Sequence, residues 1–267
     1  MNRHQLINQI NEKGSFLCVG LDSDITKLPG HLKGHPNAVF EFNRAIIDAT
    51  KKYCVSYKIN TAFYEAQGLK GWETMQQTLA YIPATHFTIA DAKRGDIGNT
   101  SAQYAKTFFE TLPFDAITVA PYMGEDSVRP FLEYKDKFAI VLGLTSNKGA
   151  SDFELQKTGG EYLYEKVLKT VASWGTPDNL MFVVGATQAA EMINIRKIVP
   201  HHFLLVPGIG TQGGSLKEVS ECGLNEEVGL LVNVSRAIIY AGGKESFTLE
   251  AEKIARSYQR EMSSYLK

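Results

Sequence analysis

The sequence is poor in cysteine, and neither charge sign dominates it. Three of its 267 residues are cysteine (Cys18, Cys54 and Cys222), and no two of them form a CxxC pair. Cysteines so few and so widely spaced predict neither a disulfide framework nor a zinc site, which favours a reducing compartment. The chain carries 28 Lys and Arg against 29 Asp and Glu. This balance argues against a nucleic-acid partner, which requires a basic surplus to neutralise phosphates.

Long hydrophobic runs and metal-binding motifs are also missing. No apolar stretch approaches the roughly 20 residues that a membrane-spanning helix needs, and the N-terminal stretch MNRHQLINQINEKGS has no signal-like apolar run. We therefore expect a cytoplasmic protein with no membrane partner. The six histidines form no HExxH motif and no HxH pair at a strand end. Neither a metal nor an organic cofactor is expected.

The sequence does contain short apolar runs that alternate with polar, amphipathic segments. The runs are apolar at nearly every position, as in parallel strands covered on both faces. They span residues 16–21, 55–59, 86–90, 116–120, 138–144, 180–186, 203–206 and 230–234. Amphipathic, helix-like segments lie between or after them, for example at 37–51, 100–111, 162–173 and 248–265.

Eight strand–helix units in one chain predict an α/β protein, a (β/α)8 TIM barrel. No linker rich in Pro, Gly or Ser divides the chain, so residues 1–267 are expected to form a single barrel domain. The alternative is a doubly wound open sheet, which more often has five to seven strands. In a barrel, catalytic residues lie at the carboxyl ends of the strands and in the loops that follow. Polar residues do lie near or beyond the ends of these runs: Asp22, Lys58, Asp91, Lys93, Ser146, Gln212 and Arg236.

The most specific local pattern is D-x-K-x-x-D, formed by Asp91, Lys93 and Asp96. Because side chains alternate along a strand, Asp91 and Lys93 are expected on one side, with Asp96 beyond the strand end. A lysine between two carboxylates keeps its proton, since both neighbours favour the charged form. Such a lysine is a proton donor and an electrostatic clamp, which suits carbanion chemistry. The alternative is a surface salt bridge at a strand end.

A second pattern, PGIGTQGG at residues 207–214, is followed later by Ser235-Arg236. In barrels, the loops after the seventh and eighth strands commonly bind phosphate through backbone N–H groups and a helix N-terminus. Glycine allows close backbone approach, and Arg236 could bind phosphate oxygens with two hydrogen bonds. The alternative is a glycine-rich turn beside a surface arginine.

With these residues in view, the chain resembles the orotidine 5′-phosphate decarboxylase family along nearly its whole length. The most specific stretch is FTIADAKRGDIGNT at 87–100, supported by VGLD at 19–22 and SRAII at 235–239. APYMG at 120–124 and LTSN at 144–147 are similar to the longer bacterial branch of the family. That branch often has a proline where this chain has Lys148, which bears on the stiffness of the loop.

The resemblance implies an activity and a set of roles. The activity would be cofactor-independent decarboxylation of orotidine 5′-phosphate to UMP and CO2, in de novo pyrimidine synthesis. Lys93 would protonate C6, Asp91 would lie beside the substrate carboxylate, and Lys58 and Asp96 would complete a network of alternating charge. The implied binding residues are Asp22 and Lys58 for the ribose, Ser146 for the pyrimidine, Pro207 as pocket lining, and Gln212, Gly213, Ser235 and Arg236 for the phosphate.

The resemblance also implies a homodimer with shared sites, in which Asp96, Ile97 and Thr100 come from the partner subunit. Two rival functions stay open. A metal-dependent sugar-phosphate decarboxylase or aldolase of the same barrel group also uses D-x-K-x-x-D, but would be sensitive to EDTA. A non-catalytic nucleotide-binding barrel would not require Lys58, Asp91, Lys93 and Asp96 together.

Overall fold

The computed structural model describes residues 1–210, 213–242 and 245–266, and the predicted barrel is present. Its parallel strands close in the order β1-β10-β9-β8-β5-β4-β3-β2. The strands are β1 (Leu17–Gly20), β2 (Ser56–Asn60), β3 (Phe87–Arg94), β4 (Ala116–Val119), β5 (Phe138–Leu144), β8 (Leu180–Val184), β9 (Leu204–Pro207) and β10 (Leu230–Val234). Each coincides with one of the apolar runs to within a few residues. The (β/α)8 prediction is thus confirmed.

One element was not expected from the sequence. A short antiparallel hairpin, β6 (Lys157–Thr158) with β7 (Glu161–Tyr162), lies outside the barrel. Its turn consists of Gly159 and Gly160, both with positive φ (63° and 93°), a conformation that glycine adopts without strain. Strands of two residues are too short to produce a recognisable alternating pattern.

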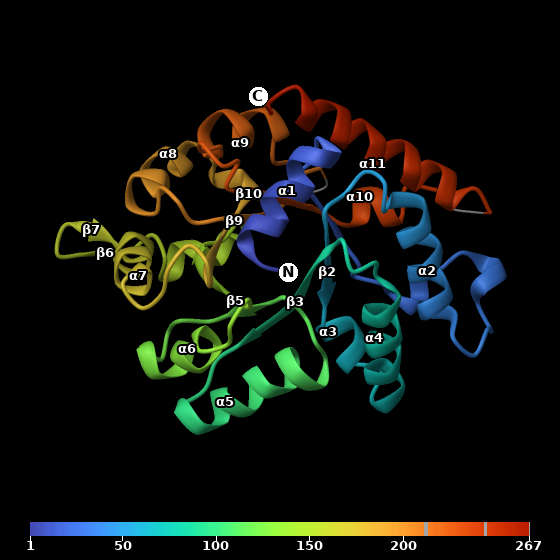
Figure 1. Cartoon of the computed structure of the whole chain (residues 1–267), viewed down its shortest axis with the longest axis horizontal. Coiled ribbons are helices and arrows are strands. Elements are labelled where there is room, and N and C mark those ends of the chain that lie inside the picture. Colours follow the sequence, from blue (N-terminus) through green and yellow to red (C-terminus); the bar gives the residue numbers. More distant parts are fainter. Residues whose placement is uncertain (211–212, 243–244, 267) are drawn as a thin grey trace. The chain divides into compact units, whose positions relative to one another are not determined.

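The chain divides into two compact units, of which the first comprises residues 3–92 and 233–267. Its principal helices are α1 (Arg3–Lys13), α2 (Ala38–Thr50), α4 (Leu69–Tyr81) and α11 (Phe247–Ser263), with the short helices α3 (Ala62–Glu65) and α10 (Arg236–Ile239). Helix α2 packs against both α4 and α11 (Figure 1). Phe42 of α2 stacks on Phe247 of α11, with ring centroids 5.3 Å apart. These aromatic contacts fix the helices that follow β1 and β10.

The second unit comprises residues 93–232. Its helices are α5 (Gly98–Lys106), α6 (Glu125–Leu132), α7 (Leu163–Ala172), α8 (Ala189–Ile198) and α9 (Leu216–Gly223). The amphipathic segment 100–111 is only partly α-helical, because α5 passes into a π-helical turn at Thr107–Thr111. Helix α5 packs on α6, and α8 packs on α9 (Figure 1). A 3-10 turn, Lys148–Asp152, follows β5 and begins at Lys148.

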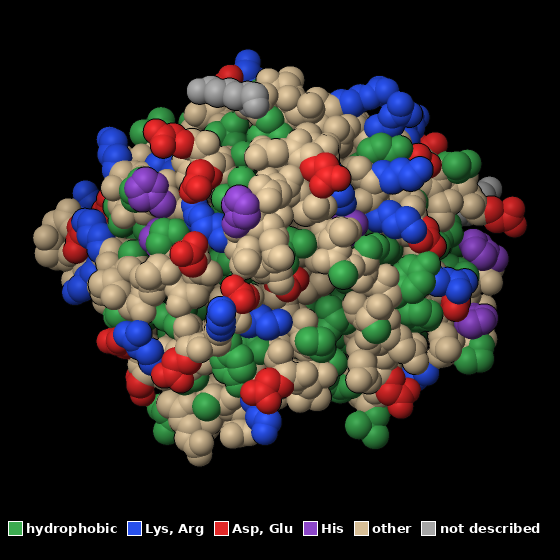
Figure 2. Space-filling view, in the orientation of Figure 1, with side chains coloured by type: hydrophobic (Ala, Val, Ile, Leu, Met, Phe, Trp, Pro, Cys, Tyr) green, Lys and Arg blue, Asp and Glu red, His purple; other side chains and the backbone are tan. Residues whose placement is uncertain are grey.

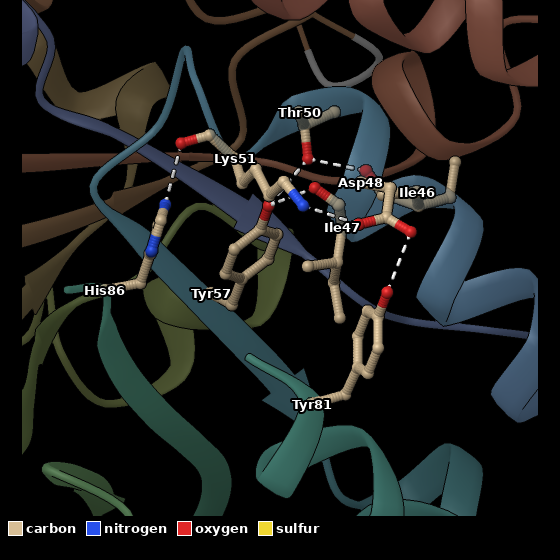
Figure 3. A network of polar contacts seen from close by, with 8 residues as sticks. All are labelled: Ile46, Ile47, Asp48, Thr50, Lys51, Tyr57, Tyr81 and His86. Atoms are coloured by element: carbon tan, nitrogen blue, oxygen red, sulfur yellow. Dashed lines mark hydrogen bonds and ion pairs between the residues drawn. The ribbon is translucent and has the colours of Figure 1, made fainter. Parts of the chain in front are cut away.

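A polar network, buried at Thr50 and Tyr57 and exposed at Asp48, lies at the amino ends of β2 and β3 (Figure 3). The Tyr57 hydroxyl of β2 is 2.8 Å from the Thr50 hydroxyl at the end of α2. The His86 ring, just before β3, has Nε2 2.9 Å from the Lys51 carbonyl oxygen. Lys51 in turn donates to Asp48, at 2.7 Å. These contacts tie the end of α2 to the strands that carry Lys58 and Asp91 further along.

The surface agrees with the balanced composition. On the face drawn in Figure 2, basic and acidic side chains are intermingled and do not gather by sign. Within the described ranges, no helix is both long and apolar enough to cross a membrane. Cys18 and Cys54 are free and buried, an environment in which cysteine packs as a small hydrophobic residue.

Candidate active site

Three of the expected site residues meet in the first unit. Lys58 Nζ donates to Asp91 Oδ2 at 2.7 Å and lies 3.6 Å from Asp22 Oδ1. Lys58 is part of β2, Asp91 is part of β3 in register with Asn60, and Asp22 follows β1. Parallel strands carry their carboxyl ends to one edge, which explains how residues far apart in sequence come together.

The Lys58 side chain is only 4% exposed, so its charge must be compensated. Burial by itself would lower the pKa of Lys58, but the charges of Asp91 and Asp22 outweigh burial and raise the pKa above its ordinary value. The lysine therefore stays a cation at neutral pH. Within the described residues, Asp22 Oδ1 accepts no hydrogen bond. One buried carboxylate oxygen at this strand edge thus keeps its capacity to accept a bond.

The backbone around Asp22 is held by side chains that sequence reasoning did not identify. The Tyr64 hydroxyl donates to the Leu21 carbonyl at 3.0 Å and itself accepts from Asn43 Nδ2 at 2.9 Å. The Tyr240 hydroxyl lies 3.2 Å from the Asp22 carbonyl oxygen. Asn43 and Tyr64 are fully buried. Asn43 is a polar residue on the apolar face of α2, and this feature of the sequence could have indicated the network.

Lys93 lies in the second unit and departs from the expected conformation. It has φ 47°, in the left-handed region that lysine rarely adopts. Its backbone N–H donates to Thr118 Oγ1 of β4 at 2.9 Å. Strand alternation assumes extended backbone on both sides of a residue, so it does not by itself orient Lys93 here. The shared side of Asp91 and Lys93 stays a prediction. The Lys93 side chain is exposed in the single chain.

Asp96 and Ile97 lie in the turn from β3 into α5, and Thr100 lies in the first turn of that helix. The Asp96 N–H donates to Ser101 Oγ at 3.1 Å, and Asp96 Oδ1 accepts from the Ile97 N–H at 2.7 Å. The Thr100 N–H donates to the Ile97 carbonyl at 2.9 Å. Ile97 is 64% exposed, which is unusual for a large aliphatic side chain. Asp96 lies beyond the end of β3, as predicted.

Ser146 follows β5 in a loop fixed by hydrogen bonds. The preceding Thr145 N–H donates to Glu154 Oε2 at 2.7 Å, and the Thr145 hydroxyl donates to Glu154 Oε1 at 2.9 Å. A side chain at Gly185 would collide with Ser146, because its Cβ would lie 2.6 Å from the Ser146 Cβ and backbone N. Pro207, another expected residue, is the last residue of β9.

The described glycines of the glycine-rich segment lie between β9 and α9. Gly208, Gly210 and Gly213 all have positive φ, of 107°, 82° and 85°. The Gly214 N–H donates to the Gly208 carbonyl at 3.2 Å. Gly213 is exposed. Gln212 was expected to contact phosphate, but it lies outside the described residues.

Ser235 and Arg236 follow β10 in the first unit. The Ser235 hydroxyl donates to the Gly20 carbonyl at 3.1 Å, which ties the end of β10 to the end of β1. Arg236 is exposed and begins the short helix α10. An exposed guanidinium beside a strand end can bind an anionic group without first breaking a buried ion pair.

The described residues therefore bring Asp22, Lys58 and Asp91 into direct contact. The same residues contain no group of three or more His, Cys, Asp or Glu arranged to hold a metal ion. They thus lend the metal-dependent alternative no support. Thr118, which contacts the Lys93 backbone, was missed. The sequence could have indicated Thr118, because it is the single polar residue of the buried strand AITV.

Comparison with known proteins identifies the family. A model of the orotidine 5′-phosphate decarboxylase / HUMPS family matches residues 15–251. A curated orotidine 5′-phosphate decarboxylase from Phocaeicola vulgatus is 57% identical, covering 100% of this chain and 99% of its own. A solved OMP decarboxylase of Leishmania donovani matches with TM-score 0.82 and 35% identity, covering 97% of this chain and 99% of its own.

The UMP synthase of the same organism matches with TM-score 0.88 and 36% identity over 99% of this chain. This chain spans 56% of that longer protein. The family model covers most of the chain, and the identity to curated relatives extends over its full length. The chain belongs to the orotidine 5′-phosphate decarboxylase / HUMPS family.

Proposed function

We propose that this protein decarboxylates orotidine 5′-phosphate to UMP and CO2, without a cofactor, in pyrimidine biosynthesis. The observation that carries the proposal is the buried Lys58, paired with Asp91 and Asp22 at the strand edge where the family motif predicts the site. Curated relatives with this activity in their names are 52–57% identical over the full chain. No described residue favours the metal-dependent alternative.

The reaction requires stabilisation of a carbanion. Loss of CO2 from C6 of the pyrimidine leaves an electron pair in a ring orbital that has no adjacent electron sink. We assign Lys93 as the ammonium group that stabilises this charge and then donates a proton to C6. Lys58 fixes the Asp91 carboxylate through the 2.7 Å ion pair, and we assign Asp91 a place beside the substrate carboxylate. Asp96 completes the alternation of charge.

Substrate binding is assigned to the remaining strand-end residues. The Asp22 oxygen that accepts no bond within the described residues, with Lys58 nearby, suits the ribose hydroxyl groups. Ser146 is assigned to the pyrimidine and Pro207 to the pocket wall. Gly213, Ser235 and Arg236 are assigned to the phosphate, with Gln212 beside them. Phosphate binding remote from C6 would contribute binding energy to the chemical step.

We further propose a homodimer in which Asp96, Ile97 and Thr100 serve the partner's site. The support is exposed apolar surface at the ends of β3 and β4: Ile97 is 64%, Tyr122 89% and Met123 47% exposed. Large apolar side chains grouped in this way are typical of an interface. Two-fold symmetry would place both copies of the segment at one interface.

We also propose that residues 1–267 form a single barrel domain and that the protein is cytoplasmic. A family match over residues 15–251 supports one barrel domain across 1–267. The cytoplasmic assignment rests on the cysteine content and on the reaction class.

The direct test is an absorbance assay. Purified protein is added to orotidine 5′-phosphate, and the loss of the orotate chromophore is followed with and without EDTA. We expect conversion at the same rate in both samples. No conversion would refute the proposed activity, and conversion abolished by EDTA and restored by a divalent metal would favour the metal-dependent alternative.

A further inference from the structure

Lys93 occupies a backbone conformation that needs support from its surroundings. Its φ of 47° is in the left-handed region, where the Cβ of a long side chain is crowded by the backbone. Residues outside glycine persist in this region only where neighbouring contacts impose it, and such positions concentrate at functional sites. A neighbouring contact is therefore expected to hold Lys93 in the left-handed conformation.

A side chain of the neighbouring strand β4 accepts a hydrogen bond from the Lys93 backbone. The Lys93 N–H donates to Thr118 Oγ1 at 2.9 Å. Thr118 is 1% exposed and lies in β4 between Ile117 and Val119, both fully buried. It pairs with Ile140 of β5, so its backbone is fixed within the barrel. A hydroxyl in such an apolar strand is costly unless it is used.

The residues after Lys93 are anchored differently. The Ala120 N–H donates to the Arg94 carbonyl at 2.8 Å, an ordinary contact between strand backbones. The Arg94 guanidinium lies over the rings of Tyr104 and Phe108, at 5.3 and 5.5 Å from their centroids. Arg94 is therefore fixed by backbone and aromatic contacts. At Lys93 itself, a threonine hydroxyl of β4 accepts the backbone N–H.

We propose that Thr118 is a positioning residue that holds the Lys93 backbone in its left-handed conformation and so aims the ammonium group. The consequence for catalysis rests on the proposed function, in which Lys93 is the proton donor. The backbone part does not depend on it. Because threonine and valine have nearly the same shape, Thr118→Val removes the acceptor with little change in volume. Thr118→Ser retains the hydroxyl and removes a methyl group.

The kinetic test compares these variants with the wild-type enzyme. Misplacement of a reacting group by about 1 Å can cost on the order of a hundredfold in rate, so we expect Thr118→Val to lower kcat about ten- to a hundredfold. KM should change little, because the ribose and phosphate contacts lie elsewhere. Thr118→Ser should restore kcat to within about threefold of wild type. A valine variant with wild-type kcat would overturn the catalytic consequence.

Two controls separate positioning from general damage. Thr74 of α4 is also buried (3% exposed), and its hydroxyl donates to the Lys70 carbonyl of the same helix. Thr74→Val therefore makes the same chemical change away from Lys93. It should leave kcat unchanged. In a Lys93→Ala background, Thr118→Val should cause no further loss, because its effect passes through Lys93. A further tenfold loss there would show that Thr118 acts independently of Lys93.

The closing experiment needs no catalytic activity. Hydrogen exchange of the Lys93 amide is measured by NMR in the wild-type, Thr118→Val, Thr118→Ala and Thr118→Ser proteins. We expect exchange to accelerate at least tenfold in the valine and alanine variants and to stay near wild type in the serine variant. Unchanged exchange in both would overturn the backbone proposal, even if the enzyme is active. Accelerated exchange in a protein with no decarboxylase activity would retain it and refute only the proposed function. If the valine variant does not fold, the alanine and serine variants give the same contrast.

Discussion

Lowering the pH from about 7 to about 4 should destabilise the fold through His86. This ring is 4% exposed, and its Nε2 lies 2.8 Å from Lys13 Nζ. The Lys13 ammonium also donates to the carbonyl oxygens of Lys51 and Cys54, at 3.0 and 2.9 Å. A neutral imidazole that carries its proton on Nδ1 can accept from this ammonium through Nε2, and the Lys51 carbonyl then accepts from Lys13 rather than from the ring. A protonated ring would instead place two cations in contact inside the protein.

The magnitude follows from the pKa of the ring. Burial first, and then the Lys13 charge, lower the pKa of His86 from 6.5 to about 4. At about 1.4 kcal/mol per pKa unit, this difference corresponds to about 3 kcal/mol of unfolding free energy. Because the folded pKa is the lower one, the unfolded chain binds the proton first. The stabilisation is therefore complete above pH 6.5 and is lost as the pH falls toward 4.

The assay is urea unfolding at a series of pH values for the wild-type protein and His86→Gln. Glutamine can still accept from Lys13 through its amide oxygen, but it does not titrate. The difference between the two unfolding free energies should change by about 3 kcal/mol between pH 7 and pH 4, in the direction that penalises wild type at low pH. Carboxylates titrate in both proteins and cancel in the difference. Parallel curves would refute the assignment of a neutral, buried His86.

Three further predictions concern the proposed reaction. Lys93→Ala should fold normally, as circular dichroism would show, and lose at least about a thousandfold in turnover, because both proton donor and charge stabilisation are removed. Arg236→Ala should weaken turnover of the phosphorylated substrate but leave turnover of orotidine, which lacks the phosphate, nearly equal to wild type. Equal loss toward both substrates would exclude Arg236 as a phosphate ligand. The variants Lys93→Ala and Asp96→Asn should each be nearly inactive alone. When they are co-expressed at equal levels, about half of the dimers are mixed, and each mixed dimer has one intact site. The mixture should therefore recover roughly a quarter of wild-type activity. No recovery, with mixed dimers confirmed by mass spectrometry, would place Asp96 in its own subunit's site.

The barrel strands could be predicted from the sequence because burial on both faces leaves a simple pattern. Runs such as 138–144 and 230–234 are apolar throughout, and both coincide with observed strands. The positions of Asp22, Lys58 and Asp91 followed from the same reasoning, since a charge at the end of an apolar strand is costly unless it is paired or used. The strand pattern alone did not predict that Lys58 pairs with both Asp91 and Asp22, because that pairing depends on the register between neighbouring strands.

The details that the sequence did not predict are those set by contacts between distant segments. The left-handed conformation of Lys93 has no local signature, since neither glycine nor asparagine marks the position. It becomes intelligible only when Thr118, twenty-five positions along the chain, is seen to accept the Lys93 N–H. The same holds for Asn43 and Tyr64, whose hydrogen bonds fix the backbone beside Asp22. In each case a chemically active residue was evident from its strand-end position, while the buried polar residue that orients its backbone lies on another element. A polar side chain within an otherwise apolar buried segment is therefore the feature to search for when the residues supporting an active site are sought from sequence.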